Sequence, residues 1–225
     1  MNPPPEQSFA GFSAETFTFF RQIGENNRGE WFEAHREQYA RHVLAPLRAL
    51  ASDLAPFMAS IDLSVELRAD RTISRIHRDT RFSHDKSPFR DHMWVTFRQR
   101  DLTPGEVPGF FFEVYAEAYR YGMGFYSASR MAMDRFRRSI DQDPERFLQM
   151  VSALERDGRF EVMGPFYKRS LRPHHPPEVR RWYDRKTFYL QRRRPLEPVL
   201  FSPELLDELV GGFVLLVPLY HFLRD

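Results

Sequence analysis

Apolar residues in the first quarter of the chain recur every three or four positions, which is the spacing of one face of a helix. Ser13 favours a helix N-cap, so a helix is predicted to begin after it and to end in the turn-forming stretch 24–28. A second helix is predicted over residues 29–54, and Pro46 is expected to kink or break it because proline lacks a backbone N–H. The apolar stripe of the first helix contains Phe17, Phe20 and Ile23.

The middle of the chain changes to the period of two that is typical of strands. Residues 92–100 show this alternation, and the stretches 61–67 and 109–119 are also predicted to be strands. The proline- and glycine-containing stretch 102–109 is a predicted turn. The two glycines of residues 121–126 allow positive φ or a close approach of the backbone to another group. Together these segments predict an antiparallel sheet.

The last hundred residues return to helical spacing, interrupted by two short apolar stretches. The predicted elements, in chain order, are a helix capped by Ser127, a helix opened by Asp143-Pro144-Glu145, a strand at 159–164, a short helix at 176–183, a strand at 186–193 and a helix opened by Ser202-Pro203-Glu204. Because helices and strands come in blocks, the pattern predicts an α+β fold, with a central antiparallel sheet packed by helices. Residues 1–8 are predicted to be a flexible tail and residues 9–225 a single domain.

Composition limits the class of protein. The chain has no cysteine, which excludes disulfides and thiolate chemistry. The proline-rich N-terminus lacks the apolar run of a signal peptide. Residues 209–223 are the most apolar segment, but they are short for a membrane span and contain Pro218 and His221, so a buried terminal helix is predicted. We therefore expect a soluble, cytoplasmic protein without a membrane partner.

The formal net charge of +2 hides two basic segments. Residues 71–100 carry eight Arg and Lys against three Asp, and residues 168–194 carry ten against two acidic residues. Basic faces of this kind attract phosphates and nucleic acids. An alternative is that the arginines reflect a general bias of the sequence, because only three of its 33 basic residues are lysine.

The first basic segment contains the dense stretch RIHRDTRFSHDKSPF, residues 75–89. In an extended conformation its odd-numbered residues share one face and its even-numbered residues the other. An aspartate between arginines holds guanidinium groups through bidentate bonds and leaves N–H donors for a phosphate or carboxylate. We expect the arginines to contact the anion, Asp79 to orient them, and the Asp85-Lys86 pair to lie at the rim. The candidate ligand-binding residues are Arg75, Arg78, Asp79, Arg81, Asp85 and Lys86.

The same stretch resembles the signature R-x-x-R-D-x-R-F-x-x-x-[D/N]-K-x-x-Y of domain-of-unknown-function family 2461, an uncharacterised bacterial and fungal family. The matching residues are Arg75, Arg78, Asp79, Arg81, Phe82, Asp85 and Lys86. Phe89 stands where the family usually has tyrosine, so aromatic packing is retained there without a phenolic hydroxyl. Residues 9–39, Gly122, Gly124 and the region of Pro218 are also similar, so the resemblance extends over almost the whole chain. It implies no established activity.

Other chemistry is less well supported. His77, Asp79, His84, Asp85 and His92 offer metal ligands, but no pair has a recognised ligand spacing and the arginines would repel a cation, so no metal is predicted. The glycine-rich loops of nucleotide-binding motifs and the G-x-S-x-G nucleophile motif are both missing from the sequence, so no cofactor is predicted and no reaction class is identified. Whether the protein is an enzyme stays open.

The expected function is therefore binding of a phosphorylated or carboxylate-bearing small ligand in an arginine-lined pocket. One alternative is a nucleic-acid-binding module that uses residues 168–194, where aromatic and cationic residues interleave. The competing prediction for that segment is a solvated surface that binds no partner. A second alternative is a purely structural network of arginine and aspartate side chains around residues 75–89.

Overall fold

The computed structural model describes residues 8–81 and 84–224, so Phe82 of the signature and nearly all of the predicted tail lie outside the described residues. The first half contains α1 (Ala14–Glu25), α2 (Gly29–Ala34), α3 (Arg36–Gln38), the π-helix η1 (Tyr39–Leu44), α4 (Ala45–Ile61), α5 (Ala69–Thr72), β1 (His92–Phe97) and β2 (Gly109–Tyr115). The second half contains β3 (Ala118–Gly124), α6 (Arg130–Gln142), α7 (Pro144–Asp157), β4 (Glu161–Met163), α8 (Pro177–Tyr183), β5 (Tyr189–Pro195), the 3-10 helix η2 (Pro198–Phe201) and α9 (Glu204–Arg224).

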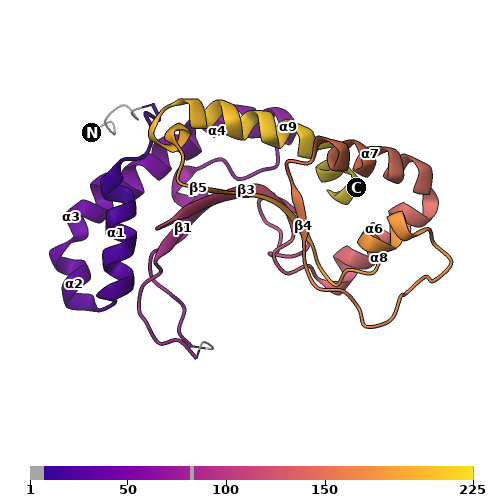
Figure 1. The fold of residues 1–225 in the computed structure, drawn as a ribbon, viewed down its shortest axis with the longest axis horizontal. Helices are drawn as coiled ribbons and strands as arrows, with labels where there is room; N and C mark the ends of the chain where they lie inside the picture. The colour runs from indigo at the N-terminus through magenta and orange to yellow at the C-terminus, as the bar shows by residue number, and fades with distance from the viewer. Residues whose placement is uncertain (1–7, 82–83, 225) are drawn as a thin grey trace. The chain divides into compact units, whose positions relative to one another are not determined.

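The strands form one five-stranded sheet in the order β1-β2-β3-β5-β4 (Figure 1). The strands β4 and β5 pair antiparallel, with Glu161 opposite Gln191 and Met163 opposite Tyr189. The predicted α+β class with an antiparallel sheet is confirmed. The described residues group into two compact units: the first unit takes 8–97, 111–120 and 193–210, and the second takes 98–110, 121–192 and 211–224. That residues 9–225 form a single domain stays a prediction.

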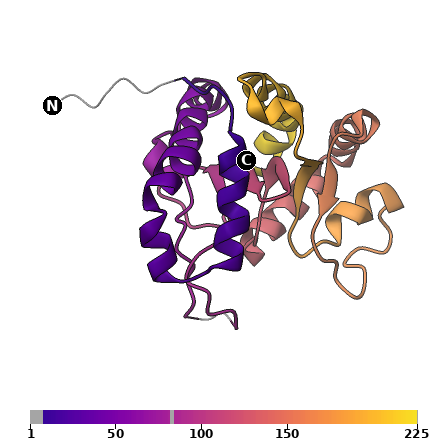
Figure 2. The ribbon, with the colours of Figure 1, turned by 60° about the vertical axis from the view of Figure 1, so that its left-hand side comes forward.

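In the first unit, α1 begins where the sequence predicts. Ser13 is the N-cap in an extended conformation, and its N–H donates to Thr16 Oγ1 at 3.3 Å. The buried face of α1 contains Phe17, Phe20 and Ile23, as expected from the spacing. This helix lies beside the helices from α2 to α4 (Figure 1, Figure 2). Phe12, just before α1, stacks on Phe112 of β2 with ring centroids 5.8 Å apart, so aromatic rings join helix layer and sheet.

The helix predicted over 29–54 is divided into several pieces. A break at His35 separates α2 from α3, and η1 then leads directly into α4. Pro46 stands in the first turn of α4, next to the change from π-helix to α-helix, but Leu44 and Ala45 keep helical φ and ψ, so the helix does not break at Pro46. The α4 helix also continues past residue 54 to Ile61.

Two strand predictions are wrong. Residues 61–67 are not a strand, because α4 runs through Ile61 and Asp62 then closes a turn by accepting from the Ser64 N–H at 2.9 Å. Residues 109–119 are not one strand but a hairpin, in which β2 ends at Tyr115 and β3 begins at Ala118. The two glycines of the stretch 121–126, Gly122 and Gly124, lie in β3, which ends at Gly124.

Both glycines of β3 have the steric roles that the sequence suggests. Gly124 has φ +147°, and a Cβ on Gly122 would lie 1.8 Å from the Leu190 carbonyl oxygen of β5. Alanine at either position therefore clashes with backbone, which does not yield as a flexible side chain does.

In the second unit, α6 is capped by Ser129 rather than by the predicted Ser127, because Ser129 Oγ accepts from the Ala132 N–H at 3.1 Å. The two residues before Ser129 belong to a loop, where Ala128 N–H donates to Thr187 Oγ1. The predicted signals of α7 are confirmed: Asp143 is its N-cap, and Gly158 ends it with φ +71°.

The last helix, α9, is long and apolar enough to span a membrane by length and composition, a test that the core helix of a soluble protein also passes. One face of α9 is fully buried against protein. The side chains on this face are Leu205, Leu209, Phe213, Leu216, Leu219, Tyr220 and Leu223. This burial agrees with the predicted terminal core helix.

Candidate functional site

The signature segment folds as an irregular antiparallel hairpin that precedes β1 (Figure 1). His77 and Phe89 form a bridge between its arms, and the Arg78 N–H donates to the Pro88 carbonyl at 2.8 Å. Exposure alternates along the first arm as predicted: Arg75, His77, Asp79 and Arg81 are exposed, whereas Ile76, Arg78 and Thr80 are buried or half-buried. Arg78 therefore lies on the opposite face from Arg75 and Arg81.

Phe89 packs this hairpin against the helices of the first unit. Its ring stacks on Phe32 of α2 with centroids 4.4 Å apart. The side-chain amide of Asn27 pairs with the Phe89 backbone twice, because Nδ2 donates to the carbonyl and Oδ1 accepts from the N–H, both at 2.9 Å. The aromatic packing expected at residue 89 is thus confirmed.

The charged side chains of the hairpin loop form separate local pairs. Asp79 binds Arg81 through Nε at 3.0 Å and through Nη2 at 2.7 Å. Asp85 accepts from Arg78 Nη1 at 2.5 Å, and Lys86 Nζ donates to the Thr80 carbonyl at 2.8 Å. The expectation that Asp79 orients three arginines is wrong, since among the described residues its side chain contacts Arg81 alone.

These contacts keep the two carboxylates ionised. Hydrogen bonds from Arg81 lower the pKa of Asp79 to about 2. Hydrogen bonds from Ser87 and the charge of Arg78 lower the pKa of Asp85. A carboxylate so stabilised is a poor general base, so the loop has the chemistry of an ion-paired structure rather than of an acid–base centre.

Arg75 lies apart from these pairs, at a pocket of about 270 Å³ within the first unit. The polar lining comprises Arg36, Arg48, Asp70, Ser74, Arg75 and His77, and the apolar lining comprises Phe32, Tyr39, Leu44, Ile73 and Ile76. Three arginines and one aspartate thus line the pocket together with apolar side chains. Burial raises the pKa of Tyr39 to about 12, so its hydroxyl is neutral at physiological pH.

The guanidinium groups at this pocket differ in what they already bind. Arg36 makes a bidentate pair with Glu33, at 2.9 and 2.5 Å. Within 8–81 and 84–224, neither Arg48 nor Arg75 has a side-chain hydrogen bond or an ion pair. Two arginines with unused donors therefore line one small pocket.

A second polar cluster, which the sequence interpretation missed, lies on the open face of the sheet in the first unit. We define the open face as the side of β1 opposite the buried residues Met93, Val95 and Phe97. Glu113 of β2 is only 6% exposed there, accepts from Arg120 Nε, and lies 3.4 Å from His92 Nε2. The sequence feature that could have indicated this cluster is the charged Glu113 inside the apolar run GFFFEVY.

The partners of Glu113 form a connected set. His92 Nδ1 lies 2.8 Å from Asp91 Oδ1, so each imidazole nitrogen faces a carboxylate. Burial and a hydrogen bond to Glu113 raise the pKa of Tyr115, which keeps its hydroxyl protonated. Glu113 therefore contacts a guanidinium, an imidazole and a phenol hydroxyl at the same time.

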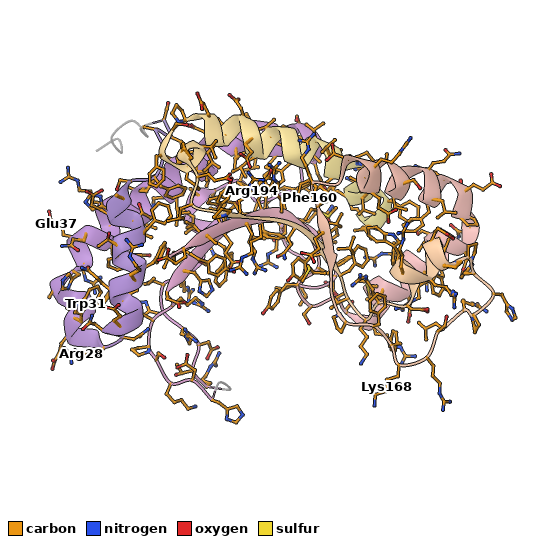
Figure 3. All side chains as sticks on the ribbon, viewed as in Figure 1. Arg28, Trp31, Glu37, Phe160, Lys168 and Arg194 are labelled. Atoms are coloured by element: carbon orange, nitrogen blue, oxygen red, sulfur yellow. The ribbon has the colours of Figure 1, made fainter. Side chains whose placement is uncertain are left out.

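The second basic segment, residues 168–194, uses several of its arginines in structural contacts. Arg185 donates to the carbonyls of Gly164 and Val162 at 2.6 and 3.2 Å. Arg194 pairs with Glu197 at 2.6 Å. Lys168, by contrast, projects from its loop into solvent (Figure 3). The charge of this segment is only partly available to a partner.

No group of three or more His, Asp and Glu side chains in the described part of the chain is arranged to hold a metal ion. His77 instead contacts the rings of Phe32 and Phe89, and Asp85 is bound by Arg78.

Comparison with known proteins identifies the family. A search of curated proteins finds no match. The family model described as "Conserved hypothetical protein (DUF2461)" matches residues 15–222, a range that includes the hairpin, the pocket and the open face of the sheet. Since this match spans nearly all of the chain, the protein belongs to the DUF2461 family.

Proposed function

We propose that the protein binds a small ligand bearing a phosphate or carboxylate in the pocket beside Arg75. The observation that carries this proposal is that Arg48 and Arg75 line the pocket without a hydrogen-bond or ion-pair partner among the described residues. Guanidinium groups offer planar pairs of donors that suit these anions. Asp70 lines the same pocket and opposes an anion, but the two arginines that lack a partner among the described residues, Arg48 and Arg75, outnumber it.

The shape of the pocket narrows the ligand further. Its volume of about 270 Å³ lies near the lower end of the range for small-molecule sites. Phe32, Ile73 and Ile76 supply apolar contact next to the charged wall. The ligand is therefore small and joins its anionic group to an apolar or aromatic part.

The remaining signature residues support the site indirectly. Arg78 and Asp85 pair with each other, and Asp79 pairs with Arg81, so their donors and acceptors are used within the loop. Their role in this proposal is to shape the hairpin that carries Arg75. We also propose that the protein is soluble, which the burial of one face of α9 by its own chain supports; its cytoplasmic location stays a prediction from the sequence.

The test is thermal unfolding with inorganic phosphate, phenyl phosphate and benzoate. Binding to the native state raises Tm, by an amount that corresponds to about 2.7 kcal/mol when the ligand is at 100 times its Kd. We expect phenyl phosphate to give the larger shift of the two phosphates, and Arg75→Ala and Arg48→Ala to remove it. Arg130→Ala is the matched control, because the Arg130 side chain is 92% exposed and lies far from Arg75 in sequence.

A wild-type protein whose Tm none of the three anions raises contradicts the proposal. So does a shift that survives in both Arg48→Ala and Arg75→Ala.

A further inference from the structure

The open face of the sheet carries aromatic rings from two adjacent strands of the first unit. Trp94 lies on β1, and Phe111 and Tyr115 lie on β2; all three are half-buried, so part of each side chain is accessible. The strand period places Phe111, Glu113 and Tyr115 on the same side of β2. Phe111 and Tyr115, four residues apart, are about 13 Å from each other along the strand.

Arginine side chains lie against each of these rings. The Arg90 guanidinium is 5.0 Å from the Trp94 ring centroid. Arg120 is 5.8 Å from the centroid of Phe111 and 5.7 Å from that of Tyr115, and Arg193 of β5 is 5.8 Å from that of Tyr115. Rings and guanidinium planes thus alternate across the face, and both kinds of plane can stack on a nucleobase.

The positive charge of the open face is not fully neutralised. Arg193 is exposed and has no carboxylate partner among the residues that the structure describes. Arg90 donates to the backbone carbonyls of Arg75 and His77 and likewise has no carboxylate within ion-pair distance in that part of the chain. Two cations therefore stand beside the rings and are available to phosphate groups.

The carboxylate of Glu113 does not cancel the positive charge of the open face. It is buried, and its carboxylate is bound by Arg120 and lies next to His92. Its hydrogen bonds hold the arginine and the tyrosine that lie over the face. Glu113 therefore positions the stacking groups rather than repelling a polyanion.

We propose that the open face of the sheet binds single-stranded nucleic acid. Bases stack on Trp94, Phe111 and Tyr115 and on the guanidinium planes beside them, and Arg90 and Arg193 contact phosphates. A single strand fits because its bases can leave their own stack, whereas the bases of a duplex are already stacked and paired. This site is independent of the pocket beside Arg75.

The test is fluorescence anisotropy of a dye-labelled oligothymidylate with the full chain. The wild type is expected to bind, with an affinity that falls linearly in a plot of log K against log salt. Tyr115→Leu should weaken binding by roughly 5- to 150-fold, the effect of losing one stacking ring. Tyr115→Phe keeps the ring and should bind like the wild type, which separates stacking from the hydroxyl contact to Glu113.

Arg193→Ala should weaken binding and lower the salt slope by about 0.7, the share of one phosphate contact to a single strand. Arg130→Ala is the matched control and should bind the oligonucleotide as the wild type does, because the Arg130 side chain is 92% exposed on α6. Far-UV circular dichroism of each variant confirms that the fold is retained.

Three outcomes overturn the proposal. The first is a wild type that does not bind the oligonucleotide at low salt. The second is an unlabelled duplex that competes as well as the single strand does. The third is a loss in Arg130→Ala equal to that in Arg193→Ala, since binding would then reflect overall charge and not this face.

Discussion

Asp79 and Arg81 are two residues apart, and their side chains form a bidentate pair at the surface of the hairpin loop. The side chain of Asp79 is 52% exposed, and its low pKa comes from the hydrogen bonds and charge of Arg81, since burial would raise it. The signature thus places an aspartate and an arginine where the loop folds them onto each other. This pair gives the loop a local constraint that a flexible charged loop would lack.

We predict that Asp79 titrates near pH 2 in the native protein, which NMR of its side-chain carboxyl carbon would measure. Its pKa is lower when folded than the value of about 3.9 in an unfolded chain. Any stabilisation from the pair is therefore complete above about pH 4 and is lost as the pH falls through 2. Arg81→Gln should move the titration of Asp79 upwards.

The control is Glu66, whose pKa is lowered to about 2 by its own pair with Arg68 and should not respond to Arg81→Gln. An Asp79 titration that stays near pH 2 in Arg81→Gln would show that another group sets its pKa.

At the scale of elements, α9 contains two adjacent glycines in very different surroundings. A Cβ on Gly211 would meet no atom within 4 Å, whereas a Cβ on Gly212 would lie 2.5 Å from the Tyr121 ring. Tyr121 is fully buried and contacts the rings of Phe160 and Phe213, so it cannot move away freely. The same substitution should therefore have opposite effects at the two positions.

We predict that Gly211→Ala raises the free energy of unfolding by about 0.5–1 kcal/mol, because alanine favours the helix. Gly212→Ala should lower it by about 1–3 kcal/mol through overpacking against Tyr121. Urea denaturation of the two variants measures both values. A gain in both would mean that α9 can shift away from β3.

The elements that local signals specify were predictable. Asp143 and Gly158 mark the two ends of α7 as expected, and the alternation of 92–100 identified β1. The hairpin between β2 and β3 was missed because Ala116-Glu117 lacks the Asn-Gly or Asp-Gly pair that marks such turns. The extension of α4 through 61 was missed because its apolar residues also suit a strand.

At the scale of the whole molecule, the candidate sites could be predicted only in part. The signature identified Arg75, but its pocket partners Arg36 and Arg48 come from helices formed far away in the sequence. The open face joins residues from 92 to 193, and no local spacing relates them. Packing of helices against the signature segment creates the pocket, and long-range strand pairing creates the open face. A motif of fifteen residues specifies neither.

The two compact units share strands, which bears on how the chain unfolds. β2, β3 and β5 each have residues in both units. If one unit unfolded alone, each of these strands would stay folded along only part of its length. Backbone N–H and C=O groups of the remaining sheet would then lose their hydrogen-bond partners. We therefore predict that the units unfold in one cooperative transition, as expected of a single domain.

Tryptophan fluorescence can test this prediction, because Trp31 and Trp94 belong to the first unit and Trp182 to the second. One variant keeps Trp182 alone through Trp31→Phe and Trp94→Phe, and the other carries Trp182→Phe. In each variant, the urea midpoint from fluorescence should coincide with the midpoint from far-UV circular dichroism. Comparing two probes within one variant removes the effect of the substitutions on stability. Separate midpoints would mean that the shared strands do not couple the units, and the chain would then unfold as two domains.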